Sequence, residues 1–262
     1  MAFFRLPDVF YTKPTPPDHF KLRYGKKPMQ FVNIRIPQGK GPFPLVFVIH
    51  GGQWKKAYTH KQMEYLCEQL KQHQIATCNI EFRRLGHQSG TYPNTIHDIH
   101  NAIEYTLNPL IEFTSHPKGK PIQPDGSCPT LPIDTNNITI LGHSSGAHLA
   151  FCIADIFKPH RLIGMAGVYD LQTCSPNLQQ VAQQYFMDHP LVSPIEQIPT
   201  VETHILVGDQ DKLLDQAQQY KQTNPQVSLT IVPNCTHFNI IDPTYVNWPT
   251  ILQTIKTPIL NN

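Results

Sequence analysis

The chain has 262 residues, of which 40% are hydrophobic and only 15% are charged, and this composition is typical of a globular protein. The formal net charge of +2 is too small to favour binding to nucleic acid or to an anionic membrane surface. No apolar run approaches the length of a membrane span, and the N-terminus lacks the pattern of a signal peptide, so we expect a cytoplasmic protein. The six cysteines form no C-x-x-C pair, so no zinc or redox site is expected.

The first half of the chain alternates between short apolar runs and longer amphipathic ones. Residues 29–37 alternate between two faces and predict a half-buried strand, whereas the continuous apolar run 45–50 predicts a strand buried on both faces. Residues 59–73 have apolar side chains at helical spacing and predict an amphipathic helix. Another strand is expected at 75–82 and another helix at 92–107.

Two irregular stretches interrupt the second half of the chain. Residues 114–137 are rich in Pro, Gly, Asp and Asn and predict a loop or insertion, and residues 172–200 are a candidate cap or lid. Regular elements surround them, with strands expected at 138–141, 161–171, 202–208 and 227–233, and helices at 145–157, 213–223 and 246–255. This alternation predicts one α/β domain over 1–262, with a mostly parallel central sheet and helices on both faces.

The strand expected at 138–141 runs directly into Gly142-His143-Ser144-Ser145-Gly146 and then into a helix. A G-x-S-x-G pattern between a strand and a helix is typical of a sharp turn that exposes a nucleophilic serine. Ser144 occupies the nucleophile position, and Ser145 would begin the helix with its backbone N–H facing the oxyanion. The sequence therefore predicts different roles for the two adjacent serines.

A second donor for an oxyanion is expected from His50-Gly51-Gly52-Gln53-Trp54, which follows the strand at 45–50. Two glycines after a strand allow backbone N–H groups to approach a ligand without obstruction by side chains. The alternative is a plain glycine turn that leaves the strand. His50, at the end of the strand, is expected to be structural rather than catalytic.

An acid and a base are expected further along the chain, in that order. Asp209 and Asp211 both follow the strand at 202–208, and either position would suit the acid. The template of Ser-His-Asp triads, in which a glycine and two further residues precede the aspartate, favours Asp211, with Asp209 as a turn or capping residue. His237 is the only histidine after these residues, so it is the predicted base. His143 and His148, which flank the serines, are not expected to act as the base.

These motifs resemble those of an α/β-hydrolase of the esterase and arylformamidase branch, from Tyr24 onward. "HGGQW" is similar to the H-G-G-x-W motif of kynurenine formamidases and related esterases, and "GHSSGAH" to their G-H-S-A-G-G-H turn. The segment "EFRRLGHQSGTYPNTIHD" resembles their E-Y-R-R…P…D segment, whose arginine and aspartate are usually structural. "GVYDL" and "THFNIIDP" also match this branch.

The resemblance implies an α/β-hydrolase fold with Ser144, Asp211 and His237 as a catalytic triad. It also implies an oxyanion site and substrate-contacting residues close to the triad. The oxyanion site would use Gly51, Gly52, Gln53 and the N–H of Ser145, and the candidate pocket walls would be Trp54 and Tyr169.

We therefore expect a serine hydrolase that needs no cofactor or metal and forms an acyl-enzyme on Ser144. Its partner would be a small-molecule ester or activated amide, with small or aryl acyl groups favoured. Within this class the alternative is an arylformamidase acting on an N-formylkynurenine-type substrate. From another class, the alternative is a hydrolase-fold protein that binds a ligand without catalysis. A peptidase is less favoured, because no separate propeller-type domain is evident.

Overall fold

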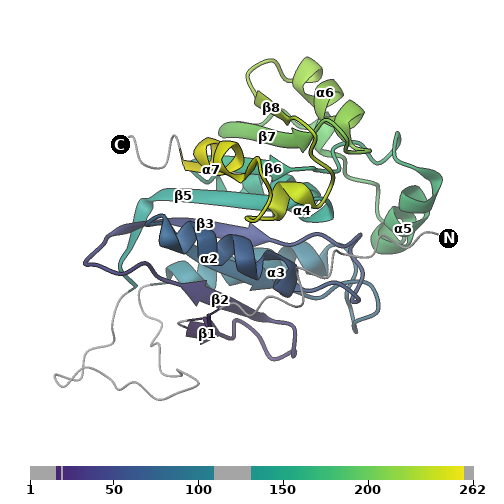
Figure 1. Cartoon of the computed structure of the whole chain (residues 1–262). Coiled ribbons are helices and arrows are strands. Elements are labelled where there is room, and N and C mark those ends of the chain that lie inside the picture. The colour runs from purple at the N-terminus through teal and green to yellow at the C-terminus, as the bar shows by residue number, and fades with distance from the viewer. Residues whose placement is uncertain (1–15, 19, 109–130, 257–262) are drawn as a thin grey trace.

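The structure is a computed structural model that describes residues 16–18, 20–108 and 131–256 (Figure 1). Its strands form one sheet in the order β1-β2-β4-β3-β5-β6-β7-β8. The strands are β1 (Phe20–Leu22), β2 (Phe31–Arg35), β3 (Phe43–Ile49), β4 (Ala76–Glu81), β5 (Ile133–His143), β6 (Arg161–Met165), β7 (Glu202–Gly208) and β8 (Ser228–Val232). The β1–β2 and β2–β4 pairs are antiparallel, and every neighbouring pair from β4 to β8 is parallel. The predicted, mostly parallel sheet is confirmed.

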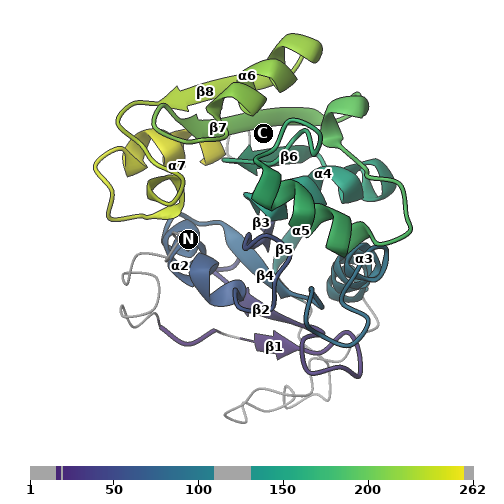
Figure 2. The same ribbon diagram turned by 90° about the vertical axis from the view of Figure 1, so that its right-hand side faces the viewer.

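Helices cover both faces of this sheet, as Figure 2 shows. The helices are η1 (His60–Met63), α2 (Glu64–Gln72), α3 (Asn94–Leu107), α4 (Ser145–Phe157), α5 (Pro176–Phe186), η2 (Pro194–Glu196), α6 (Leu214–Thr223), η3 (Asn239–Ile241) and α7 (Trp248–Lys256). On one face, Leu66 of α2 and Ile251 of α7 belong to one apolar cluster. On the other, Ile99 of α3, Ile153 of α4 and Tyr220 of α6 belong to a second cluster. The sheet is therefore buried between two apolar layers.

The expectation that the strand at 29–37 is half-buried is wrong. All five residues of β2, which lies between β1 and β4, are buried, and Val32 and Ile34 belong to an apolar cluster. Its polar residue Arg35 forms ion pairs with Asp18 and Glu68, each at 2.9 Å. Alternation in the sequence identified the two faces of the strand, but the polar face is covered by charged partners rather than by water.

The boundaries of two other strands also differ from the expectation. β5 begins at Ile133 rather than at 138, and its register with β3 shifts between Pro44 and Leu45, so residues 135–137 lie at an irregularity of the strand. These polar residues hid the start of β5 in the sequence. The remainder of the predicted insertion, residues 114–130, lies outside the described residues. β6 ends at Met165, because the chain turns at Ala166, which has a φ of 47°.

The stretch at 172–200, expected to be a cap or lid, contains α5 and η2. Among the described residues, no helix is long and apolar enough to cross a bilayer.

Candidate active site

Ser144 lies in the turn between β5 and α4, with a φ of 56° and a ψ of −123°. L-residues seldom adopt a positive φ, so the surroundings must hold this conformation. A methyl group at Gly142 would collide with the carbonyl oxygen of Gly146, and one at Gly146 would collide with the carbonyl oxygen of Ile49. Both glycines are therefore needed for the close approach of α4 to β3 and β5. The turn leaves Ser144 on the wall of a cavity.

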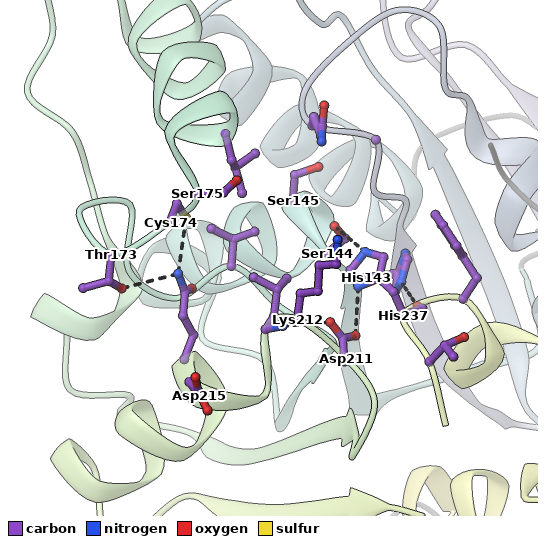
Figure 3. A pocket seen from close by; sticks show the side chains of 18 of the residues that line it. His143, Ser144, Ser145, Thr173, Cys174, Ser175, Asp211, Lys212, Asp215 and His237 are labelled. Carbon is purple, nitrogen blue, oxygen red and sulfur yellow. Dashed lines mark hydrogen bonds and ion pairs between the residues drawn. The ribbon is translucent and has the colours of Figure 1, made fainter. Parts of the chain in front are cut away.

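The structure brings Ser144, His237 and Asp211 together, as the sequence predicts (Figure 3). His237 Nε2 is 3.0 Å from Ser144 Oγ, and His237 Nδ1 is 2.9 Å from Asp211 Oδ2. The three residues follow β5, β7 and β8, which run parallel in one sheet. Because parallel strands end at the same edge, side chains far apart in sequence meet there. This is the geometry in which a histidine can take a serine proton while a carboxylate holds the imidazole.

The two candidate acids have different partners. Asp211 accepts a hydrogen bond from the N–H of Leu213 through Oδ1 at 2.9 Å, which leaves Oδ2 for His237. Asp209 instead accepts a hydrogen bond from the N–H of Cys235 at 3.1 Å, across the turns that follow β7 and β8. The geometry therefore assigns Asp211 to the imidazole and Asp209 to the turn.

The two histidines that flank the serines are structural. His143 Nε2–H donates to the carbonyl oxygen of His237 at 2.9 Å, and His148 Nε2–H donates to that of Val192 at 2.8 Å. Burial lowers the pKa of His143 to about 3 and that of His148 to about 4. Both imidazoles are therefore neutral near pH 7. One tethers the loop that carries His237, and the other tethers the segment between α5 and η2.

The predicted oxyanion loop lies beside Ser144. Gly52, Gln53 and Ser145 line the same cavity as Ser144. Gly52 has a φ of 117°, which favours glycine, and a side chain there would collide with Tyr58. Gly51 lies behind this wall, where a methyl group would be 2.8 Å from the carbonyl oxygen of His143. Gly51 therefore allows close packing, and Gly52 and Gln53 are the residues of this loop that reach the cavity.

The expectation that Trp54 forms a pocket wall is wrong. Its side chain is buried, and it stacks on Tyr185 of α5 with ring centroids 5.4 Å apart. It also contacts the edge of His148. Trp54 therefore anchors the loop to the core and to α5, because its large apolar ring is more stable there than at a wet cavity surface.

The same expectation for Tyr169 is also wrong. Its side chain is fully buried between Phe151 and Tyr220, with ring centroids 5.2 and 4.9 Å away. Its backbone N–H is held by the Oε1 atom of Gln216 at 3.0 Å. The residue thus belongs to the core, where its ring packs within an aromatic cluster.

The cavity has a volume of about 610 Å³, and much of its lining was not predicted from the sequence. Thr173, Cys174, Ser175 and Leu178 come from the expected cap segment, and Figure 3 places the first three across the pocket from His237. Other lining residues without a motif come from the surroundings of η1 and from α6, namely Tyr58, Gln62, Leu213, Asp215, Gln216 and Gln219. For the glutamines in this set, the one available signal in the sequence was the occurrence of a hydrogen-bonding side chain within an amphipathic helix.

No group of three or more His, Cys, Asp or Glu side chains that could hold a metal ion occurs in the part of the chain that the structure describes. The cysteines in that part are free thiols, and burial raises the pKa of Cys78 to about 12. The described cysteines therefore resemble packing residues more than ligands or nucleophiles.

Comparison with known proteins identifies the fold. The BD-FAE family model matches residues 32–117. A protein of Arabidopsis thaliana, described as a probable isoprenylcysteine alpha-carbonyl methylesterase, is 25% identical over 130 residues, which cover 49% of this chain and 23% of that protein. The chain thus matches less than a quarter of that relative's length.

Solved esterase structures cover nearly the whole chain. Esterase B from Lactobacillus rhamnosis has a TM-score of 0.70 and 17% identity, covering 95% of this chain and 88% of that one. An acetyl ester-xyloside bifunctional hydrolase from Caldicellulosiruptor lactoaceticus has a TM-score of 0.69 and 16% identity, covering 93% and 97%. An esterase from Pyrobaculum calidifontis has a TM-score of 0.68 and 14% identity, covering 87% and 80%. The chain has the α/β-hydrolase fold, and the proteins that it resembles are esterase-type hydrolases.

Proposed function

We propose that the protein is a serine hydrolase that cleaves small carboxylic esters through an acyl-enzyme on Ser144. The observation that carries the proposal is the continuous line of contacts at the wall of the cavity, in which Asp211 is 2.9 Å from His237 and His237 is 3.0 Å from Ser144. A serine alone is a weak nucleophile at neutral pH, and an oriented imidazole supplies the base that it needs.

In the first half of the reaction, His237 Nε2 takes the proton of Ser144 as Oγ bonds to the carbonyl carbon of the ester. The negative charge on the carbonyl oxygen would be met by the backbone N–H groups of Ser145, Gly52 and Gln53. When the carbonyl re-forms, the bond to the alcohol oxygen breaks, and His237 gives its proton to the leaving alcohol. The acyl group stays on Ser144.

In the second half, water attacks the acyl carbon while His237 takes one of its protons. The carboxylic acid leaves as Ser144 Oγ recovers a proton from His237. Asp211 holds the imidazole in place and stabilises its charged form in both halves. The chemistry closes without a cofactor, because the proton that Ser144 gives to the leaving alcohol is replaced by one from water, and His237 ends each half in its neutral form.

The lining supports small or aryl substrates. Val168, Leu178 and Leu213 provide apolar contact, and hydroxyl and amide side chains line other parts of the wall. A cavity of about 610 Å³ is within the usual range for small-molecule sites. Because the proteins that the chain resembles are esterases, we place ester hydrolysis ahead of deformylation of an aryl amide.

The test is hydrolysis of p-nitrophenyl acetate by the wild type, Ser144→Ala and Ser145→Ala. We expect Ser144→Ala to lose about 10³- to 10⁶-fold in kcat. Ser145→Ala should stay within about threefold of the wild type, because it keeps its backbone N–H and loses only a weak bond. That bond is 3.4 Å long, from the Trp54 N–H to Ser145 Oγ.

A fluorophosphonate probe should label the wild type and Ser145→Ala but not Ser144→Ala. Ester hydrolysis that survives Ser144→Ala would overturn the nucleophile assignment. An unlabelled and inactive wild type would favour a binding protein without catalysis. A higher kcat/KM for N-formylkynurenine than for p-nitrophenyl acetate would change the substrate class to formamides.

A further inference from the structure

The carbonyl oxygen of Gly51 accepts hydrogen bonds from two buried side chains. His50 donates through Nδ1–H at 2.7 Å, and Gln62 donates through Nε2–H at 3.0 Å. Each of these two residues is 1% exposed. A carbonyl oxygen has two lone pairs, so both of its acceptor positions are occupied by side chains.

This arrangement controls the direction of the next N–H group. A trans peptide is planar, and its C=O and N–H point in opposite directions. Holding the Gly51 oxygen on one side therefore holds the Gly52 N–H on the other. Gly52 lines the cavity beside Ser144, whereas Gly51 does not.

The loop needs such a restraint. Gly52 has a φ of 117°, and the next two residues, Gln53 and Trp54, have φ values of 54° and 55°. Positive φ is unfavourable for residues with a side chain, and a peptide between two glycines can rotate with little steric resistance. Without the two donors, the loop could adopt a rotated Gly51–Gly52 peptide in which the N–H turns away from the cavity.

Gln62 is itself held by a rigid support. Its backbone N–H donates to the carbonyl oxygen of Thr59 at 3.3 Å within η1. Its neighbour His60 is fixed to the buried carboxylate of Glu81 through Nδ1 at 2.8 Å. The amide of Gln62 thus reaches Gly51 from a turn that is tied to the central sheet by β4.

We propose that Gln62 is a positioning residue of the oxyanion site, which sets the direction of the Gly52 N–H through the carbonyl of Gly51. The inference rests on the proposed serine hydrolase function. Gln62 belongs to none of the sequence motifs, and its role is to keep a backbone donor aimed at the developing oxyanion.

The decisive variant is Gln62→Met, which keeps the length of the side chain and removes its donor. Loss of one oxyanion donor costs about 10²- to 10³-fold, so a donor that is only loosened should cost at least about tenfold in kcat/KM. The affinity for phenylboronic acid, whose adduct on Ser144 carries the same negative charge, should fall by a similar factor. The midpoint of the pH–rate profile should stay at its wild-type position, because the contacts of His237 are untouched.

Gln69→Ala on α2 is the matched control, because the side-chain amide of Gln69 donates to Gln72 in an exposed setting, and the backbone bond of Gln69 to His73 does not depend on its side chain. It should retain wild-type kinetics and boronate affinity. Gln62→Asn, which keeps the amide but shortens the chain, is the second variant should Gln62→Met prove unstable. It should show the same paired loss, because the shorter amide ends short of Gly51.

Three results would overturn the inference while the wild type remains an active, probe-labelled hydrolase. One is a soluble Gln62→Met or Gln62→Asn protein with wild-type kcat/KM. Another is a loss of rate without any loss of boronate affinity. The third is a shift of the pH midpoint, which would place the effect on His237. An inactive and unlabelled wild type would instead refute the proposed function itself.

Discussion

Asp211 shows how the surroundings of a single side chain define its role. One carboxylate oxygen accepts the N–H of Leu213 and the other faces His237, so the group cannot rotate without losing a bond. Asp209, two residues earlier, uses its carboxylate to hold the N–H of Cys235. Two aspartates in one short loop therefore have separate tasks, one toward the imidazole and one toward the backbone.

We predict that Asp211→Asn lowers kcat about 10⁴-fold, because an amide in this place favours the wrong tautomer of His237. Asp209→Asn should stay within about tenfold, because its Oδ1 can still accept the backbone bond from Cys235. Steady-state hydrolysis of p-nitrophenyl acetate by both variants measures the difference. A larger loss in Asp209→Asn than in Asp211→Asn would reverse the assignment.

At the scale of residues, the sequence predicted the positions that a motif or an elimination identifies. Ser144 follows from the strand–turn–helix context, and His237 is the only histidine after the acids. Trp54 and Tyr169 were placed on the pocket wall by resemblance, and this failed because resemblance does not say toward which side a ring points. Gln62 was invisible because its function depends on a bond to the backbone of a distant loop.

At the scale of elements, one ion pair connects the end of β4 to α3. Arg83 binds Asp98 through Nε at 2.8 Å and through Nη2 at 2.6 Å. The side chain of Asp98 is fully buried, and it also accepts bonds from the Arg83 N–H and from Gln30. This pair lies in the segment whose arginine and aspartate were expected to be structural, and the geometry fits that role.

We predict that Arg83→Ala lowers the free energy of unfolding by about 3 kcal/mol, because it leaves a buried carboxylate without a cation. The double variant Arg83→Ala/Asp98→Ala should lose less than the sum of the two single losses. Urea denaturation measures all three, and Lys27→Ala, at an exposed bond to Gln88, is the control. A loss below about 1 kcal/mol for Arg83→Ala would mean that water solvates Asp98 after the change.

The strands and helices were largely predictable because most have apolar periodicity, but their ends were not. β5 begins earlier than expected because polar residues at an irregularity interrupt its pattern. β2 is buried on its polar face because Arg35 meets two carboxylates there. In both cases the deciding partner lies elsewhere in the chain, so no local pattern could reveal it.

At the scale of the whole molecule, neutral, buried imidazoles hold together the chain segments that surround the candidate site. His143 joins the turn between β5 and α4 to the loop of His237, and His148 joins α4 to the segment before η2. These bonds connect chain segments that follow different strands. They tie the turn of Ser144, the loop of His237 and the segment before η2 into one packed unit, so protonation of these histidines affects more than their own contacts.

As the pH is lowered, the protein should therefore begin to lose stability at a higher pH than titration of its carboxylates alone would cause. The folded state lowers the pKa of His143 to about 3 and of His148 to about 4, from an ordinary value of 6.5. Between these values the unfolded chain binds more protons, so stability is complete above pH 6.5 and falls as the pH decreases. At about pH 5 each imidazole should cost about 2 kcal/mol relative to neutral pH.

The test is the unfolding free energy, measured by urea denaturation at about pH 7.5 and at about pH 5. We predict that the difference between the two pH values is about 2 kcal/mol smaller in His143→Gln than in the wild type, and about 2 kcal/mol smaller in His148→Gln. Glutamine can donate a hydrogen bond but does not titrate, so each variant removes one proton-linked contribution. His97→Gln, at an exposed position on α3, is the matched control and should keep the wild-type difference. If both buried variants keep that difference as well, these imidazoles gain their protons without unfolding, and acid lability must come from other groups, such as His204, whose pKa burial also lowers to about 4.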